Sequence, residues 1–385
     1  MADRIAIQCV STLCSLGDYA GLTQHLCCSE PSDVMTVADT VCGRVDDKWL
    51  SDYAGSPYQY SRAEQFVLAL LDQQRTRLEQ CLAGVDPQRV AVVMGTTAGG
   101  IAEAEFSRRP GHEFTDNYDF RFQRLGQVAR FAAKQLGARG LITGVSTACT
   151  SGARAIGLGI RWLSLGWCDV AVAGGIDALC EMTEQGFASL EAVSPGFCRP
   201  FDSQRDGINL GEGGALLVLA RQEPGERDRV SIAGYGESMD AWHMSAPHPE
   251  GAGIARAMQG AMAMSGRAPG DVGYINMHGT GTPHNDAMEG NAVLRVLGSG
   301  VPVSSTKTMT GHTLGAAGAL EAAICYALLN GDLEVLPVQH GLREQDPLMK
   351  GLQVVVDTGR ELDHPVVISN SCGFGGHNAS LVLVR

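Results

Sequence analysis

Short apolar runs alternate with longer helical patterns along most of the chain. The short runs have the length of buried β-strands and lie at 90–94, 170–173, 215–219, 274–277, 366–369 and 381–384. Apolar and small residues recur at helical spacing at 63–82, 152–165, 253–264, 286–297 and 315–329. Strands that alternate with helices predict an α/β fold built of layered sheets and helices.

A similar pattern occurs in both halves of the chain. Residues 145–152 and 303–312 are rich in Ser, Thr and Gly, and each stretch precedes a helical segment of small residues. Small residues let two central helices pack closely between sheets. The alternative is that such polar clusters open helices in any fold. The charged segment 221–229 follows a predicted strand, so we place a boundary there, with domains 1–225 and 226–385.

Composition excludes several classes of function. The chain has 385 residues and is 44% hydrophobic, enough for a large core. A formal net charge of −13 without a dense basic run disfavours nucleic-acid binding. No apolar stretch is long enough to predict membrane insertion. The 12 cysteines are scattered and no basic, apolar leader opens the chain, which favours reduced thiols in the cytoplasm.

Cys149 is the leading candidate for a nucleophile. It stands among small residues directly before the predicted helix at 152–165. Amides and the dipole at a helix start favour an anion, so we expect the pKa of this thiol to be lowered by about one unit from roughly 8.5. The alternative is a small residue packed in the core.

Three further segments carry candidate chemistry. His278 follows a predicted strand, Lys307 and His312 share the segment 305–312, and Phe374 lies in a glycine loop after the strand at 366–369. Each histidine taken alone is better explained as a core or surface residue, and its place inside a motif reverses that preference. A metal site is not expected, because the two histidines lie in separate segments with no carboxylate at ligand spacing.

Four motifs occur here in a fixed order. They are Thr-Ala-Cys-Thr-Ser-Gly at 147–152, His-Gly-Thr-Gly-Thr-Pro at 278–283, Lys-Thr-Met-Thr-Gly-His at 307–312 and Gly-Phe-Gly-Gly at 373–376. With them, the chain resembles the β-ketoacyl-[acyl carrier protein] synthases of the elongating, Cys-His-His class, from about Ser61 to the C terminus. The resemblance implies a thiolase-like fold, two related halves in an αβαβα layered structure.

The resemblance also implies a reaction. Cys149 would accept an acyl group, and the carbanion formed when a malonyl thioester loses carbon dioxide would attack it. His278 and His312 would donate hydrogen bonds to the enolate. Lys307, which the family pairs with a glutamate fourteen residues on, here Glu321, would keep His312 neutral. The pathway would be fatty-acid or type II polyketide or aryl-polyene chain elongation.

Supporting residues are implied in the same way. The amides of Cys149 and Phe374 would form an anion hole. Gly373, Gly375 and Gly376 would let the main chain come close enough to form it. Phe374 would be a gate over the acyl pocket. Thr280 and Thr282 would bind the phosphopantetheine arm of an acyl carrier protein, so no separate cofactor is expected. The remaining assignments are Phe187, Met182 and Ile101 in the pocket wall, and Arg62, Arg124, Arg130, Lys134 and Arg205 at a basic rim for the acidic carrier.

The family dimerises, which implies a homodimer or a heterodimer with a chain-length-factor-like subunit, with 117–136 in the contact. This chain departs from the family before Ser61, where 17–61 is shortened, and at Cys372 and His377. Two other functions stay open. A thiolase acting on coenzyme A esters would use a second cysteine, such as Cys372, as base. A non-catalytic, chain-length-determining partner subunit usually lacks the nucleophile.

Overall fold

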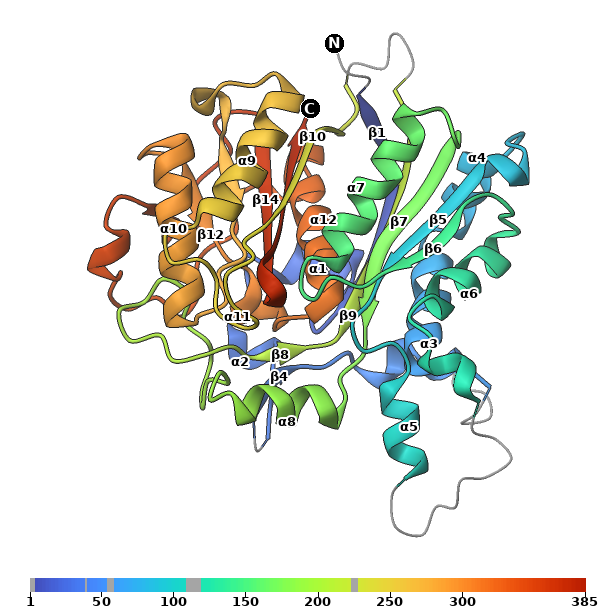
Figure 1. Ribbon diagram of the computed structural model, residues 1–385, viewed down its shortest axis with the longest axis horizontal. Coiled ribbons are helices and arrows are strands. Elements are labelled where there is room, and N and C mark those ends of the chain that lie inside the picture. The colour runs from blue at the N-terminus through green and yellow to red at the C-terminus, as the bar shows by residue number, and fades with distance from the viewer. Residues whose placement is uncertain (1–3, 39, 54–58, 109–118, 223–227) are drawn as a thin grey trace.

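The computed structural model describes residues 4–38, 40–53, 59–108, 119–222 and 228–385. Its core is a twelve-stranded mixed sheet with helices on its faces (Figure 1). In chain order the strands are β1 (Ile5–Cys14), β2 (Gly17–Asp18), β3 (Thr36–Val37), β4 (Val41–Gly43), β5 (Val90–Gly95), β6 (Ile142–Val145), β7 (Val170–Asp177), β8 (Leu210–Gly211), β9 (Gly213–Arg221), β10 (Ser231–Met239), β11 (Tyr274–Asn276), β12 (Pro302–Ser304), β13 (Gln353–Val354), β14 (Val366–Gly373) and β15 (His377–Val384). Twelve of the described strands form the large sheet, and β3, β4 and β8 form a small second sheet.

All five predicted helical segments are helical, and six further α-helices of the described residues lie outside them. In chain order the α-helices are α1 (Tyr19–His25), α2 (Pro31–Val34), α3 (Arg62–Gln73), α4 (Arg75–Leu82), α5 (Ile101–Ser107), α6 (Gln127–Leu136), α7 (Ser151–Ser164), α8 (Glu181–Ser189), α9 (Ala252–Ser265), α10 (Pro283–Leu297), α11 (Lys307–Thr310) and α12 (Ala317–Asn330). The predicted helix at 63–82 is in fact two, because the backbone leaves the helical conformation at Gln74 (φ −121°, ψ 23°). Among the described residues, no helix is long and apolar enough to span a membrane.

The large sheet contains the same arrangement twice. One half has the order β6-β5-β7-β9-β1 and the other β12-β11-β14-β15-β10, and the halves meet where β1 pairs with β10. In each half the first three strands are parallel to one another, and each of the last two pairs antiparallel with the strand before it in the order. This repeated order confirms the two related halves. The boundary at 225/226 lies outside the described residues and stays a prediction.

Helices α7 and α12 lie side by side near the centre of the molecule (Figure 1). Glycines allow this close approach. A Cβ atom added at Gly152 would lie 2.9 Å from the Ala319 nitrogen, and one at Gly318 would lie 2.8 Å from the Ala153 Cβ. The two small-residue helices therefore pack against each other as the sequence predicts, which places the starts of both near one site.

Gly318→Ala is expected to destabilise the protein by about 1–3 kcal/mol, because the added methyl overpacks the contact between α7 and α12. Gly186→Ala is the matched control, since a Cβ there meets nothing within 4 Å and the residue lies inside helix α8. That control is expected to leave the free energy of unfolding unchanged or to raise it slightly. Urea unfolding of both variants measures the difference, and equal stabilities would contradict the packing argument.

Strands β1, β6, β10 and β12 were not delimited by the apolar pattern. Strand β10 shows why, since Gly234 and Gly236 occupy positions where an added Cβ would lie 2.0 Å from carbonyl oxygens of α9. Helix α9 rests directly on the strand backbone, so glycines stand where apolar side chains would mark a strand. Strand β1, in the segment that departs from the family, lies at the centre of the sheet between β9 and β10.

Candidate active site

The turn between β6 and α7 presents Cys149. Ala148 has a left-handed backbone (φ 52°), which costs a residue with a Cβ about 1–2 kcal/mol. Side chains hold this turn: the Ser151 hydroxyl donates to the Ala148 carbonyl at 2.5 Å and accepts from the Thr147 amide at 2.9 Å. The Ser and Thr residues around Cys149 thus fix the position of its thiol, two residues before the helix begins.

The Cys149 thiol is buried, and its environment raises its pKa rather than lowering it. Burial raises the pKa to about 12, while Lys307 and the amides of Phe374 and Cys149 act in the opposite direction. The expectation of a lowered pKa is therefore wrong, because loss of hydration outweighs the helix start. At neutral pH the resting residue is a thiol, and forming its thiolate requires a proton acceptor close to the sulfur.

The rate of Cys149 alkylation by iodoacetamide is expected to rise about tenfold per pH unit between pH 7 and pH 9, because the thiolate fraction is proportional to hydroxide concentration well below the pKa. Peptide mass spectrometry at each pH isolates Cys149 from the other cysteines. A rate that is already constant at pH 7 would contradict the raised pKa.

The two predicted histidines meet beside this thiol. The ring centroids of His278 and His312 are 5.0 Å apart, and one donor atom from each ring lies within 4.8 Å of the Cys149 sulfur and of the other. Burial and the charge of Lys307 lower the pKa of both rings well below the usual value, and His312 adds to the effect on His278. Both imidazoles are therefore neutral at physiological pH, and each can donate or accept a proton.

Lys307 lies buried in α11 and forms an ion pair with Glu321 of α12. Burial raises the pKa of the Glu321 carboxyl to about 7, against the opposing effect of Lys307. The Lys307 charge also acts on Cys149, His278 and His312, in each case lowering the pKa. The predicted pairing is present, and the cation lies where it disfavours imidazolium formation.

Two buried acids that sequence analysis missed support the site. Glu289 of α10 accepts hydrogen bonds from the amides of His278 and Gly279 at 2.9 and 3.0 Å. Asp177, at the end of β7, accepts from the Thr96 hydroxyl at 2.6 Å and from the Gly315 amide at 2.6 Å, joining the two halves. Both follow apolar or helical runs in which acids are ordinarily surface residues, so nothing in the local pattern distinguished them.

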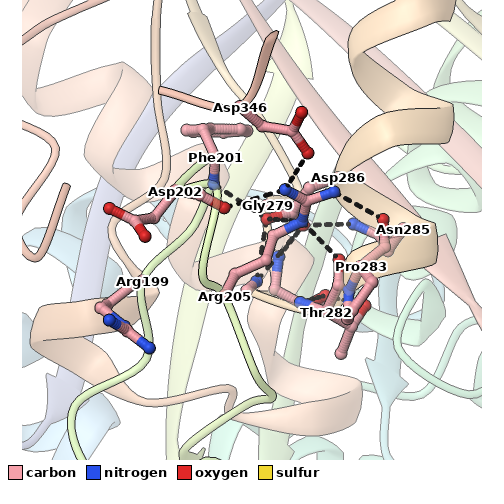
Figure 2. A network of polar contacts seen from close by, with 12 residues as sticks. Arg199, Phe201, Asp202, Arg205, Gly279, Thr282, Pro283, Asn285, Asp286 and Asp346 are labelled. Atoms are coloured by element: carbon pink, nitrogen blue, oxygen red, sulfur yellow. Dashed lines mark hydrogen bonds and ion pairs between the residues drawn. The ribbon is translucent and has the colours of Figure 1, made fainter. Parts of the chain in front are cut away.

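Arg205 binds the loop that follows His278, and Figure 2 shows its contacts with Thr282, Pro283 and Asp346. Its guanidinium donates to the carbonyls of Thr282 and Pro283 at 3.2 and 2.8 Å and pairs with Asp346 at 2.5 Å. Asp286 accepts from the Phe201 amide at 3.0 Å in the same network. With a side chain 4% exposed, Arg205 cannot belong to a rim for a carrier protein, so that prediction is wrong.

Arg62 also forms ion pairs within the protein. It binds the buried Glu212 carboxylate at 2.6 Å and Asp47 at 3.0 Å, so its charge is neutralised within the protein. The rim assignment of Arg62, whose side chain is 26% exposed, stays a prediction. Arg124, Arg130 and Lys134 are exposed, and their assignment stays a prediction.

Comparison with known proteins decides the family. Residues 50–224 match the family described as "Beta-ketoacyl synthase, N-terminal domain", and residues 230–340 match the corresponding C-terminal domain. The chain belongs to the β-ketoacyl synthase family. This identification confirms the resemblance seen in the four motifs, and it leaves the thiolase alternative without support.

Several relatives of this chain carry a functional name. The "3-oxoacyl-[acyl-carrier-protein] synthase 2" of Staphylococcus aureus is 42% identical over 263 residues, 65% of this chain and 63% of the relative. The enzyme of that name from Synechocystis is 35% identical over 319 residues, 78% of this chain and 76% of the relative. The match thus spans less than two thirds of the length of the Staphylococcus relative.

Solved structures agree on the fold. A ketosynthase in complex with its chain length factor from Xenorhabdus doucetiae superimposes with a TM-score of 0.89 at 36% identity, covering 99% of this chain and 98% of the other. The ishigamide ketosynthase/chain length factor gives a TM-score of 0.88 at 27% identity, with both chains fully covered. The predicted thiolase-like α/β fold is confirmed.

A cavity of about 230 Å³ opens at the Cys149 thiol. Phe374 lies at its mouth, 37% exposed, with its ring 5.4 Å from that of Phe187. Of the three predicted wall residues only Phe187 lines this cavity; Met182 is 55% exposed and Ile101 lies elsewhere. Sequence analysis missed further lining residues, namely Leu190, Ala192, Ile208, Asp240, Ser245, Ala246, Pro247, His284, Asn285 and Asn378.

The glycine loop lies against the nucleophile. A Cβ atom at Gly373 would lie 3.1 Å from the Cys149 nitrogen, so a larger residue there would push the loop away from the turn by a few tenths of an ångström. Gly375 (φ +79°) has the left-handed backbone that favours glycine, directly after Phe374. Cys372 lines the cavity beside Cys149, and burial raises its pKa well above the usual value. Its thiol therefore stays protonated at neutral pH and cannot accept a proton as a base.

The donor set Cys149, His278 and His312 is one that zinc accepts, and its atoms lie close enough to share an ion. The buried Lys307 ammonium opposes a cation there, because its charge already acts on all three side chains. The expectation that the site works without a metal stays a prediction.

Proposed function

We propose that this chain is a 3-oxoacyl-[acyl carrier protein] synthase that extends an acyl chain by decarboxylative condensation with a malonyl unit. The observation that carries the proposal is the convergence of Cys149 with two neutral imidazoles at a cavity large enough for an acyl thioester. A nucleophile with two uncharged hydrogen-bonding groups can both accept an acyl group and stabilise an enolate.

The first step transfers the acyl group. Sγ of Cys149 attacks the thioester carbonyl of an acyl carrier protein, and its proton passes to a neutral imidazole because the thiol pKa is too high for spontaneous ionisation. The tetrahedral oxyanion is held by the amides of Cys149 and Phe374, which already face the sulfur. The carbon–sulfur bond of the donor then breaks, and the pantetheine thiolate leaves with the proton.

The second step forms the carbon–carbon bond. The malonyl thioester loses carbon dioxide, and the electron pair of the broken bond becomes an enolate whose oxygen accepts hydrogen bonds from His278 and His312. The enolate carbon attacks the acyl-Cys149 carbonyl, and the thiolate of Cys149 leaves and takes up a proton. The product is a 3-oxoacyl thioester two carbons longer, and Cys149 returns as a thiol.

The approach to the cavity suits a phosphopantetheine arm. Thr280 and Thr282 line the cavity together with Cys149, and their hydroxyls are hydrogen-bonded to each other at 2.9 Å. The arm would deliver both substrates, so no further cofactor is required. Phe374, in contact with Phe187 across the cavity, is placed to gate the acyl pocket.

We further propose a dimer, built around β6. This strand pairs with β5 on one side and ends the large sheet, and exposed apolar residues surround it: Phe120, Leu125, Leu141 and Ile142. An unpaired, apolar sheet edge favours pairing with another chain. The chain length factor complexes among the similar structures support a heterodimer, and the intact Cys149 favours the catalytic rather than the partner role.

We also propose a cytoplasmic location, which the free cysteines support.

A condensation assay tests this function. The protein, alone and with a co-expressed chain-length-factor-like subunit, is incubated with acyl carrier proteins bearing saturated or polyenic chains and with malonyl carrier protein. The proposal predicts release of carbon dioxide and a carrier-bound 3-oxoacyl product two carbons longer. Product from acyl-coenzyme A and not from any carrier-bound chain would contradict it.

A further inference from the structure

The loop that carries Phe374 is the turn of a β-hairpin. Strands β14 and β15 pair antiparallel, and Gly373 at the end of β14 lies opposite His377 at the start of β15. Residues 374–376 between them form the turn. Gly373 also packs against the backbone of Cys149, where a Cβ atom added to it would lie 3.1 Å from the Cys149 nitrogen. The position of Phe374 relative to the thiol therefore depends on how the base of this hairpin is held.

The other side of the base is bound to helix α7. One terminal guanidinium nitrogen of Arg154, in the first turn of α7, lies 3.3 Å from Nδ1 of His377. A guanidinium has only donors, so Nδ1 accepts this hydrogen bond and the ring proton is on Nε2. Burial and Arg154 lower the pKa of His377 against the opposing effect of Glu237, which keeps the ring neutral. The hairpin is thus tied to the helix that Cys149 directly precedes.

Arg154 is itself held in place. Its Nε forms an ion pair with Glu237 of β10 at 3.1 Å, and its side chain is 20% exposed. The same carboxylate accepts a hydrogen bond from the Tyr235 hydroxyl at 2.6 Å and pairs with Arg161 at 2.6 Å. A fixed carboxylate therefore orients the guanidinium that donates to His377.

Backbone hydrogen bonds join the turn to a different segment. The Gly375 amide donates to the Met244 carbonyl at 2.7 Å, and the Asp240 amide donates to the Gly376 carbonyl at 2.8 Å. Both partners lie in the irregular segment that follows β10. These bonds hold the turn to a loop, whereas the Arg154–His377 bond holds the hairpin to the helix behind the thiol.

We propose that Arg154 and His377 are positioning residues that set how far Phe374 covers the Cys149 thiol. Their hydrogen bond keeps the hairpin close to α7, with Phe374 at the mouth of the cavity. Without the bond, the turn moves away from the thiol more often and the mouth widens. The inference rests on the proposed function for its purpose, because Cys149 is there the acyl acceptor that the cavity serves.

Two alkylating reagents of different size test the proposal. Iodoacetamide is small and N-phenylmaleimide is bulky, and both react with the thiolate, so the ratio of their rates at Cys149 reports access and not the thiol pKa. Arg154→Met and His377→Leu are each expected to raise the ratio of maleimide to iodoacetamide rates about fivefold, the population change expected when one hydrogen bond is lost. The double variant is expected to show no further rise, because both changes remove the same bond. Peptide mass spectrometry isolates Cys149 from the other cysteines.

Control variants separate this link from a general loss of structure. Arg161→Met removes another partner of Glu237 and leaves the bond to His377 intact, so the ratio is expected to stay at the wild-type value. His377→Asn is expected to restore that value, because its Oδ1 can accept where Nδ1 did. An unchanged ratio in Arg154→Met or His377→Leu, or an equal rise in Arg161→Met, would overturn the proposal. Neither a carrier protein nor a malonyl donor takes part, so the result does not depend on whether the protein catalyses condensation.

Discussion

Lys307→Met is expected to lower the rate of condensation at least about 100-fold and to destabilise the protein by about 3–5 kcal/mol. The loss of stability follows because Glu321 is left buried without its partner. The loss of activity follows because the pKa values of His278 and His312 rise once the cation is gone. Urea unfolding and an assay of product formation measure the two effects separately.

The pH profile separates an electrostatic role of Lys307 from a merely structural one. Neutral imidazoles are needed, and Lys307 helps to keep their pKa values low, so removing it moves the acid limb of the residual activity to higher pH. Lys350→Met, at an exposed lysine, is the matched control and is expected to change neither stability nor profile. An unshifted acid limb in Lys307→Met would refute the electrostatic role.

His312→Ala and His278→Ala are each expected to reduce the rate of condensation by about 10²–10³, the usual effect of removing one preorganised hydrogen-bond donor. Both rings are neutral and each places an atom within 4.8 Å of the Cys149 sulfur, so in the proposed reaction each would stabilise the enolate. Single-turnover kinetics with a preformed acyl-enzyme measures this step alone.

Acyl transfer is expected to respond differently. The oxyanion of that step faces backbone amides, so a histidine matters there only as acceptor of the Cys149 proton. We therefore expect at least one of the two substitutions to slow acylation and both to slow condensation. His364→Ala, at an exposed residue, controls for general effects. Full condensation activity in either site variant would contradict the proposed enolate site.

The sequence predicted the members of the site better than their electrostatics. Cys149, His278, Lys307 and His312 stand in motifs with fixed order, and the structure brings them together. The pKa of Cys149 was predicted in the wrong direction, because burial depends on how the two halves close over the thiol. A helix start can be read from a sequence, whereas loss of hydration cannot.

The sequence also did not reveal which charged residues are buried. Asp177 binds the Gly315 amide of the other half of the chain, and Glu289 folds back on the amides of His278 and Gly279 at the preceding loop. Neither contact leaves a local pattern that distinguishes these residues from surface carboxylates. Arg205 looked like a surface cation and is instead buried in the network behind the His278 loop. The fold itself was more predictable, except where glycines replace the apolar side chains of strand β10 under helix α9.

Intact-protein mass spectrometry without a malonyl donor tests the central claim most directly. The protein and its Cys149→Ala variant are incubated with acyl carrier proteins that bear a panel of acyl chains. We predict a mass gain equal to one acyl group for at least one chain, absent in the variant, with the preferred chain identifying the primer. An acyl adduct that persists in Cys149→Ala, or none with any carrier-bound chain even when the partner subunit is present, would contradict Cys149 as the acyl acceptor.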